Sequence, residues 1–275
     1  MKNPISVSSA PIAKLGGKKY FDLAGTIEVM KRILAESVVD GFELQLEPEW
    51  DKENPPLTDG QYEEWTRTRK YDVDDIVDLV REEGLPILSV HGSRDIGNYL
   101  CATRRKDRER GKRLIGNTVH IAKSLGASIC VFHLWDTWSS AFDVDGLRAA
   151  FSREMDLFPE VKGSVENIPT HLAGHTPFSL SRSFDFLTLD LRWAKMYREL
   201  EAFESLARKI VNIHLHAELG PGGWALDGSG QDFHRYLDVI IERWHYSGLL
   251  TVEPRGSMDP SAFHHFVEAM RSITV

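Results

Sequence analysis

Eight short apolar runs, separated by amphipathic stretches, are the feature that most constrains what this chain can fold into. The runs are Ile5–Ser9, Gly41–Leu46, Pro86–Val90, Ser128–Leu134, Gly163–Asn167, Phe184–Leu191, Ile210–Leu215 and Gly248–Val252. Such alternation is typical of βαβ units around a parallel sheet that is buried on both faces. We therefore expect eight parallel strands, each followed by a helical segment.

The stretches between the runs carry helical spacing and helix-terminating residues. Apolar side chains recur at i, i+3, i+4 and i+7 in two of them, namely Leu237, Ile240, Ile241 and Trp244, then Phe263, Phe266, Val267 and Met270. Gly84 and Gly126 stand where helices would end before a strand. Asp232 and Asp259 stand where helix N-caps are expected, and Pro260 follows the latter in the first turn.

Eight strands and eight helical segments in 275 residues predict a single-domain (β/α)8 TIM barrel spanning residues 1–275, an α/β fold. A doubly wound open sheet fits the count nearly as well, but no Gly-x-Gly-x-x-Gly motif follows the first run. The long insert Glu47–Val73, rich in proline, is interpreted as a loop over one rim. The Gly-rich stretch Gly220–Gly230 is interpreted as a second rim loop.

Composition narrows the class of protein. With 33 Lys and Arg against 41 Asp and Glu, the net charge is −8, which disfavours nucleic-acid partners because the overall field repels phosphates. Two cysteines, Cys101 and Cys130, exclude a disulfide framework. No apolar stretch approaches the length of a signal h-region or a membrane span. We expect a cytoplasmic protein without a membrane partner.

Ionisable residues stand at the ends of six of the predicted strands. They are His91, His133, Glu166, Asp190, His214 and Glu253. One such residue is more often a solvated loop residue than a ligand, but the carboxyl ends of barrel strands all open on the same rim, so six would converge on one pocket. Carboxylates and imidazoles without thiolates suit Mn²⁺, Mg²⁺, Co²⁺ or Zn²⁺. Because buried carboxylates repel one another, a divalent cation is the expected cofactor.

In the order and spacing of these residues, nearly the whole chain resembles the xylose isomerase-like TIM barrel superfamily. That superfamily includes sugar and sugar phosphate isomerases and epimerases, tagatose/psicose 3-epimerases, hydroxypyruvate isomerases, inosose dehydratases and the endonuclease IV group. The element Val39-Asp40-Gly41-Phe42-Glu43-Leu44 is similar to its second-strand Gly-x-x-Glu-Leu motif. The resemblance implies a metal-dependent isomerase or epimerase acting on a small carbohydrate or hydroxy-keto compound.

The resemblance also implies roles for individual residues. The metal would be held by Glu166, Asp190, His214 and Glu253. Glu166 and Glu253 would be the catalytic pair that removes a proton beside a carbonyl and returns it through an enediolate. The residues expected to line the substrate are His91, His133, His216, Arg192 and Trp135. A homodimer is common on this scaffold, although nothing in the sequence demonstrates one.

Departures from the family pattern keep other functions open. Trp193 stands three residues after Asp190, where the family commonly has histidine, and Glu218–Gly230 lacks the Asp-x-His of the endonuclease branch. A dehydratase or lyase, an endonuclease IV-like phosphodiesterase and a non-catalytic barrel remain alternatives. The basic run Arg104–Arg113 is interpreted as a solvated helix face. Trp138 could form a wall or lid, or merely pack on the rim, and His171, His175 and His234 are interpreted as surface residues.

Overall fold

The strands form a closed parallel barrel with helices between them. The computed structural model describes residues 3–56, 68–220, 223–225, 233–256 and 260–273. The sheet order is β6-β5-β4-β3-β2-β1-β9-β7, and pairing of β6 with β7 closes the barrel. All neighbouring strands of this ring are parallel, with bounds β1 Ile5–Ser8, β2 Gly41–Gln45, β3 Ile87–His91, β4 Ile129–Phe132, β5 Lys162–Glu166, β6 Phe186–Asp190, β7 Ile210–Gly220 and β9 Leu249–Gly256. The predicted (β/α)8 fold and its eight strands are confirmed.

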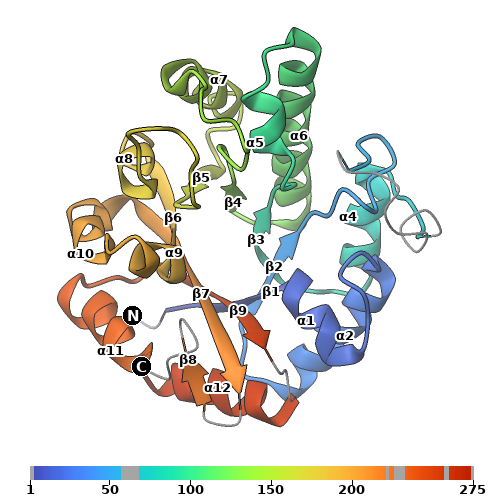
Figure 1. Ribbon diagram of the computed structural model, residues 1–275. Helices are drawn as coiled ribbons and strands as arrows, with labels where there is room; N and C mark the ends of the chain where they lie inside the picture. The colour runs from blue at the N-terminus through green and yellow to red at the C-terminus, as the bar shows by residue number, and fades with distance from the viewer. Residues whose placement is uncertain (1–2, 57–67, 221–222, 226–232, 257–259, 274–275) are drawn as a thin grey trace.

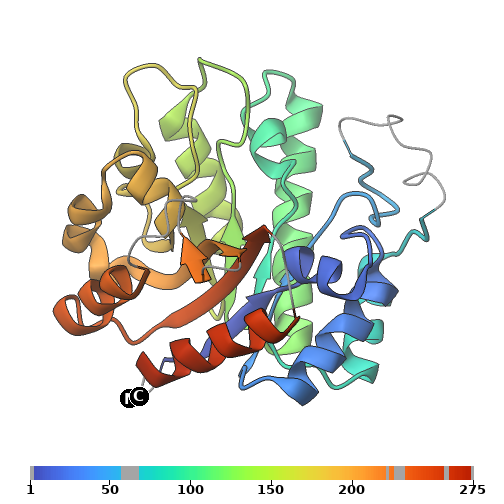
Figure 2. The ribbon, with the colours of Figure 1, turned by 60° about the horizontal axis from the view of Figure 1, so that its bottom comes forward.

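Helices form an outer layer around these strands (Figures 1 and 2). The α-helices are α1 Ser9–Ile12, α2 Leu23–Glu36, α4 Val73–Glu82, α5 Ile96–Leu100, α6 Arg105–Leu125, α7 Val144–Met155, α8 Pro177–Ser181, α9 Leu191–Met196, α10 Leu200–Phe203, α11 Phe233–Asp238 and α12 Pro260–Ile273. The 3₁₀ segments are η1 Ala13–Gly16 and η2 Glu204–Lys209. Aspartate side chains cap the amino ends of two of these helices. Asp22 accepts a hydrogen bond from Gly25 N at the start of α2, and Asp143 accepts one from Gly146 N at the start of α7. No helix in the described part of the chain is long and apolar enough to cross a membrane.

Two segments differ from the sequence-based interpretation. In the stretch predicted as the second rim loop, β7 extends to Gly220 and pairs antiparallel with a ninth strand, β8 Gly223–Ala225; residues 221–222 and 226–230 lie outside the described residues. The helical stripe ending at Trp244 does not keep its 3.6-residue period. Helix α11 ends at Asp238 and passes into a π-helical turn, η3 Val239–Arg243, in which Trp244 N bonds Val239 O at 3.1 Å. The N-cap predictions at Asp232 and Asp259 also lie outside the described residues.

The insert after β2 is tied down rather than loose in its described parts, residues 47–56 and 68–72. Trp50 is buried in the core, and Arg94 Nη1 donates to Glu47 at 2.7 Å and to Glu49 at 3.0 Å. Burial raises the pKa of Glu47 to about 8; the neighbouring Glu49 adds to this rise and Arg94 opposes it. Arg110 Nε donates to Asn54 Oδ1 at 3.2 Å, which fastens the insert to α6. Residues 57–67 lie outside the described residues.

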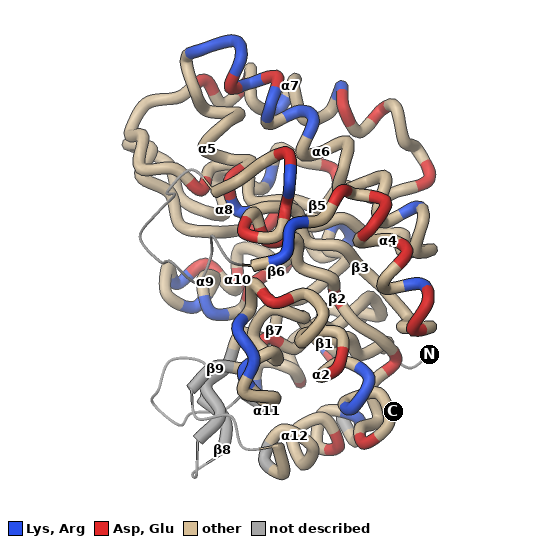
Figure 3. The backbone as a smooth tube through the Cα atoms, turned by 90° about the vertical axis from the view of Figure 1, so that its right-hand side faces the viewer, with Lys and Arg blue, Asp and Glu red and all other residues tan. Residues whose placement is uncertain are grey.

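The basic run lies on helix α6 and its charges meet acidic neighbours. Arg104 pairs with Asp107 at 2.7 Å, and Lys112 pairs with Glu109 at 2.9 Å. Figure 3 shows Lys and Arg interspersed with Asp and Glu along the outer helices. Such exposed pairs contribute little stability each.

A belt of buried polar side chains crosses the inside of the barrel, one residue per strand on seven strands. Its members are Ser6, Glu43, Ser89, Ser164, Thr188, Asn212 and Thr251. They bond one another: Ser6 Oγ meets Thr251 Oγ1 at 2.7 Å, Thr251 Oγ1 donates to Asn212 Oδ1 at 2.8 Å, and Ser164 Oγ meets Thr188 Oγ1 at 2.7 Å. Because buried polar groups are costly unless paired, this network fixes the floor on which the upper residues stand.

Two glycines of helix α6 should respond oppositely to the same substitution. Gly126 ends the helix at φ 78°, in the left-handed region, so Gly126→Ala should lower the free energy of unfolding by about 1 kcal/mol. Gly116 lies within the helix with open space where a Cβ would stand, so Gly116→Ala should raise it by about 0.5–1 kcal/mol. Urea denaturation measures both; equal shifts in one direction would contradict the assignment of the helix end.

Candidate functional site

The carboxyl ends of the barrel strands bring the predicted ionisable residues together. His91, Glu166 and Asp190 are the last residues of β3, β5 and β6, and His133 follows the last residue of β4. His214 and His216 lie in β7, and Glu253 lies in β9. All of these side chains are buried or nearly so, with His133 the most exposed at 20%. The site is therefore shielded from bulk water and rich in charge.

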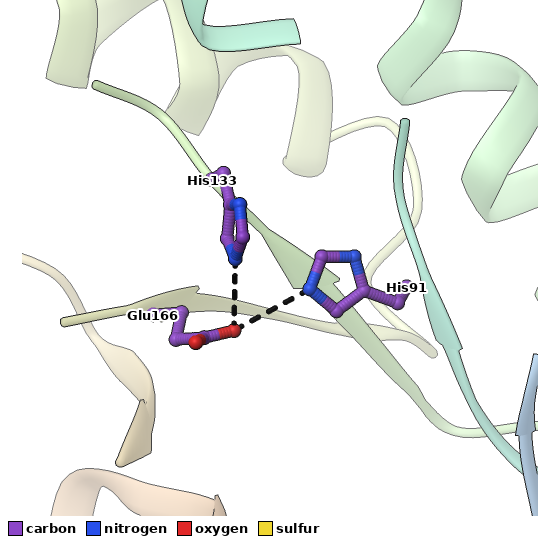
Figure 4. A group of neighbouring side chains, drawn as sticks. All are labelled: His91, His133 and Glu166. Carbon is purple, nitrogen blue, oxygen red and sulfur yellow. Dashed lines mark hydrogen bonds and ion pairs between the residues drawn. The ribbon is translucent and has the colours of Figure 1, made fainter. Parts of the chain in front are cut away.

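Glu166 joins two histidines from neighbouring strands (Figure 4). Its Oε2 lies 3.1 Å from His133 Nε2 and 3.4 Å from His91 Nε2. The His91 and His133 rings meet edge to face, with centroids 4.7 Å apart. Burial lowers the pKa of His133, but the charges of Glu166 and Asp136 outweigh it and raise the pKa to about 10. These three residues form one group whose ligand atoms could share a cation.

His214 lies at the centre of the site, between three carboxylates. Its Nε2 is 3.2 Å from Glu43 Oε1, and its Nδ1 is 3.2 Å from Glu166 Oε2 and 3.7 Å from Glu253 Oε1. His214 and Glu43 are both fully buried. Glu43 is itself held by Ser89 Oγ at 2.8 Å and by Asn212 Nδ2 at 3.1 Å. The polar belt thus fixes Glu43, which in turn fixes the His214 ring.

The two carboxylate oxygens of Asp190 have different partners: one caps a helix and the other faces the site. Its Oδ1 accepts from the backbone N–H groups of Arg192 at 2.7 Å and Trp193 at 3.2 Å, which makes it the N-cap of α9. Its Oδ2 lies 3.3 Å from His216 Nδ1, and Glu253 Oε2 lies 3.9 Å from the same nitrogen. Asp190, His216 and Glu253 form a second group able to share a cation.

The neighbouring charges give the site's groups pKa shifts in different directions. Burial would raise the pKa of Glu166, but His214 and His133 hold it well below its ordinary value. Burial raises the pKa of Glu253, and the negative charges of Glu166 and Glu43 add to this against the opposing histidines. Burial would lower the pKa of His214, but Glu43, Glu253 and Glu166 raise it well above its ordinary value. The two candidate catalytic carboxylates therefore differ in environment.

The four residues that the resemblance assigns to the metal are gathered at one end of the barrel but divided between groups. Asp190 meets His216, whereas His214 meets Glu43, Glu166 and Glu253. Glu253 belongs to both the His214 and the His216 groups. His216, predicted as a substrate residue, thus lies where a ligand to a cation could lie.

The remaining predicted substrate residues lie in different surroundings. Trp135 is 1% exposed, packs near Phe184, and donates its indole N–H to Ile168 O at 2.9 Å, so it supports the rim from within. The Arg192 guanidinium lies over the Trp193 ring, 4.7 Å from the ring centroid. Trp193 meets His216 edge to face at 6.5 Å, and therefore packs beside the ring that faces Asp190.

Two rim residues pair in a way that the sequence did not indicate. Trp138 is 86% exposed and its ring stacks on His171, with centroids 4.6 Å apart. His171 is exposed, which agrees with its interpretation as a surface residue, and its partner there is Trp138. The two residues belong to loops that follow different strands, so sequence spacing carried no signal of their contact.

Glu43 is the functional residue that sequence reasoning left without a role. It lies in β2 and not at its end, so a search limited to strand ends passed over it. The signal was nevertheless present, because strand side chains alternate in direction. Ser89, Ser164, Thr188, Asn212 and Thr251 each stand two residues before a site residue, which marks an inward-facing polar layer to which Glu43 belongs.

The donor set fits a divalent cation. It offers carboxylate oxygens and imidazole nitrogens from four strands and no thiolate, which suits Mn²⁺, Co²⁺, Mg²⁺ or Zn²⁺. Glu43 Oε1 and His214 Nδ1 are buried, and their 3.2 Å contacts with His214 Nε2 and Glu166 Oε2 lack hydrogen-bond geometry. Several buried carboxylates around such atoms leave negative charge that a cation would offset.

Several solved structures that are similar to this chain carry the names of sugar epimerases. No protein-family model and no curated protein matches the chain by sequence. D-allulose 3-epimerase from Methylomonas sp., solved with D-allulose, superposes with a TM-score of 0.65 at 15% identity over 99% of this chain and 95% of that chain. The 3-keto-D-glucoside 4-epimerase YcjR from E. coli gives 0.60 at 14% over 98% and 99%.

A xylose isomerase domain protein from Alicyclobacillus acidocaldarius is similar to the same extent. Its TM-score is 0.61 at 14% identity, over 99% of this chain and 98% of that chain. At such identities the likeness establishes the fold. The chain therefore shares its (β/α)8 barrel with these proteins, and the predicted fold is confirmed.

Removing the Glu43 carboxylate should destabilise the protein strongly. Glu43→Ala would leave His214 buried beside an unfilled space, so the free energy of unfolding should fall by about 3–5 kcal/mol. Glu36→Ala, at an exposed position of α2, is the matched control and should change it by less than about 0.5 kcal/mol. Denaturant titration in the presence of a chelator measures both; a loss below about 1 kcal/mol for Glu43→Ala would contradict its positioning role.

Proposed function

We propose that this protein is a divalent-metal-dependent isomerase or epimerase acting on a small carbohydrate-like substrate. The observation that carries the proposal is the placement of two carboxylates around one imidazole. Glu166 from β5 and Glu253 from β9 approach His214 Nδ1 at 3.2 and 3.7 Å. Two carboxylates facing one space from different strands can remove and return a proton on a molecule held between them.

The residues proposed to hold the cation are Glu166, Asp190, Glu253 and one or both histidines of β7. Bound there, a divalent cation supplies Lewis-acid polarisation of adjacent substrate oxygens and so makes the neighbouring C–H group more acidic. Asp190 contributes Oδ2, because its Oδ1 is occupied by the start of α9. Glu43 orients His214 from below.

Proton transfer is assigned to Glu166 and Glu253. His214 and His133 keep Glu166 ionised, so it is present as the carboxylate form that a proton acceptor requires. Glu253 lies across the site on β9, 14% exposed, and is suited to exchange a proton with the opposite side of the substrate. The buried walls around both groups limit the access of water and strengthen these interactions.

A carbohydrate-like substrate is supported by the chemistry of the site and by its relatives in fold. Carboxylates and imidazoles provide both donors and acceptors for hydroxyl groups. The solved neighbours carry names of sugar epimerases, including D-tagatose 3-epimerase-like protein and L-ribulose 3-epimerase, at 17% and 13% identity. A dehydratase would begin with the same proton removal. Analysis of the reaction products distinguishes a dehydratase from an isomerase or epimerase.

A second candidate, phosphodiester hydrolysis, is favoured by one observation. His91, His133 and Glu166 form a group that could hold an additional cation. Two or three ions for each chain, together with cleavage of abasic DNA, would favour this function over isomerisation.

Replacing either proposed catalytic carboxylate should nearly abolish turnover. Glu166→Gln and Glu253→Gln keep the side-chain shape and remove the base, so kcat should fall about 10²- to 10⁴-fold. The readout is incorporation of deuterium from D₂O into ketoses, with circular dichroism to confirm folding. Glu160→Gln, at an exposed residue paired with Lys123, is the matched control and should leave exchange unchanged. Undiminished exchange by a folded Glu166→Gln or Glu253→Gln protein would remove that residue from the mechanism.

Metal titration separates the two β7 histidines. The wild type should bind about one Mn²⁺ or Co²⁺ for each chain by calorimetry and elemental analysis. Asp190→Ala should weaken binding by at least tenfold, since it removes a carboxylate that no other residue replaces. His214→Ala and His216→Ala, tested separately, show which imidazole is a ligand. A folded wild-type protein that binds no divalent ion would overturn the proposed function.

A further inference from the structure

A cavity opens at the end of the barrel opposite the candidate site. Its volume is about 570 Å³. Its wall includes residues at the amino ends of the strands: Leu88 of β3, Ile129 of β4, Lys162 of β5, Val211 of β7 and Leu249 of β9. The candidate catalytic residues stand at the carboxyl ends of these strands. A volume of this size is in the range of small-molecule sites.

The floor of this lower cavity is apolar. Ile129, Val131 and Leu249 form a hydrophobic cluster of their own, with Leu88 and Val211 packed against it. The polar belt lies one layer above this cluster, because Ser164 and Thr251 follow Lys162 and Leu249 by two residues on their strands. A molecule in the lower cavity would therefore be separated from the catalytic groups by that bonded layer.

The mouth of the lower cavity is cationic. Lys162 and Arg208 both line it, with the half-buried Trp244 and the exposed His245 beside them. Among the described residues, no Asp or Glu lines the cavity, and neither cation forms an ion pair with a carboxylate. The chain has a net charge of −8, so a cavity mouth with two cations and no carboxylate differs in charge from the protein as a whole.

We propose that the lower cavity binds a small organic anion, with its apolar body on the Leu88–Ile129–Leu249 floor and its carboxylate, sulfonate or phosphate group between Lys162 and Arg208. An indole wall and a rim of two cations complement such a molecule in both shape and charge. This site is independent of the proposed isomerase site, since the two share no residue.

The test uses 8-anilinonaphthalene-1-sulfonate as the anionic probe and N-phenyl-1-naphthylamine as its neutral counterpart. Fluorescence titration of the full chain should show one saturable sulfonate site and at least tenfold weaker binding of the neutral compound. The Lys162→Gln/Arg208→Gln pair should weaken sulfonate binding at least tenfold. Ser128→Trp, at an exposed position of the cavity wall, should block binding without altering the core.

Matched controls separate specific binding from other causes. Arg105→Gln/Arg113→Gln removes the same charge from exposed positions of α6 and should leave the affinity unchanged. Asp190→Ala changes the upper site and the start of α9, neither of which lines the lower cavity, and should also leave the affinity unchanged. Equal loss in the α6 pair, equal affinity for the neutral compound, or loss in Asp190→Ala but not in Ser128→Trp would each overturn the proposal. The last result would place the probe in the upper site, whatever the fate of the isomerase function.

Discussion

Burial of four carboxylates inside one barrel is the constraint on which the rest of this structure depends. Glu43, Glu166 and Asp190 are almost inaccessible, and the Glu253 side chain is 14% exposed. Unpaired, each would be expensive to remove from water. The histidines of β3, β4 and β7, the backbone N–H groups at the start of α9 and the polar belt supply the compensating partners. A cation at the carboxyl ends of the strands would complete this compensation.

The belt explains how a polar site can stand on a stable fold. Barrel interiors are usually filled by layers of bulky apolar side chains. Here one layer consists of serine, threonine, asparagine and glutamate side chains that bond one another, and an apolar layer appears only toward the amino ends of the strands. The floor of the site is thus rigid through hydrogen bonds, and the His214 ring above it is oriented by Glu43 below.

Features that depend on residues close together in the sequence could be predicted, whereas contacts between residues far apart in the sequence could not. Strand ends and their ionisable residues are local features, so the barrel and the convergence of Glu166, His214 and Glu253 were predictable. The choice of partner was not, because Glu43 and His214 are 171 residues apart and meet only when the barrel closes. The π-helical turn after Asp238 was also beyond reach, because the apolar spacing of Leu237, Ile240 and Trp244 is that of an ordinary α-helix.

Trp193 packs against His216, one of the two histidines of β7, and both imidazoles remain in the site. Its ring packs edge-on beside His216, whose Nδ1 then faces Asp190, while Glu43 holds His214 through Nε2 and directs its Nδ1 toward Glu166. Glu253 lies within reach of both Nδ1 atoms. His216 of β7 thus places an imidazole beside Asp190, although Trp193 stands where the resemblance leads us to expect a histidine. Glu253 therefore links the group around His214 to the group around His216.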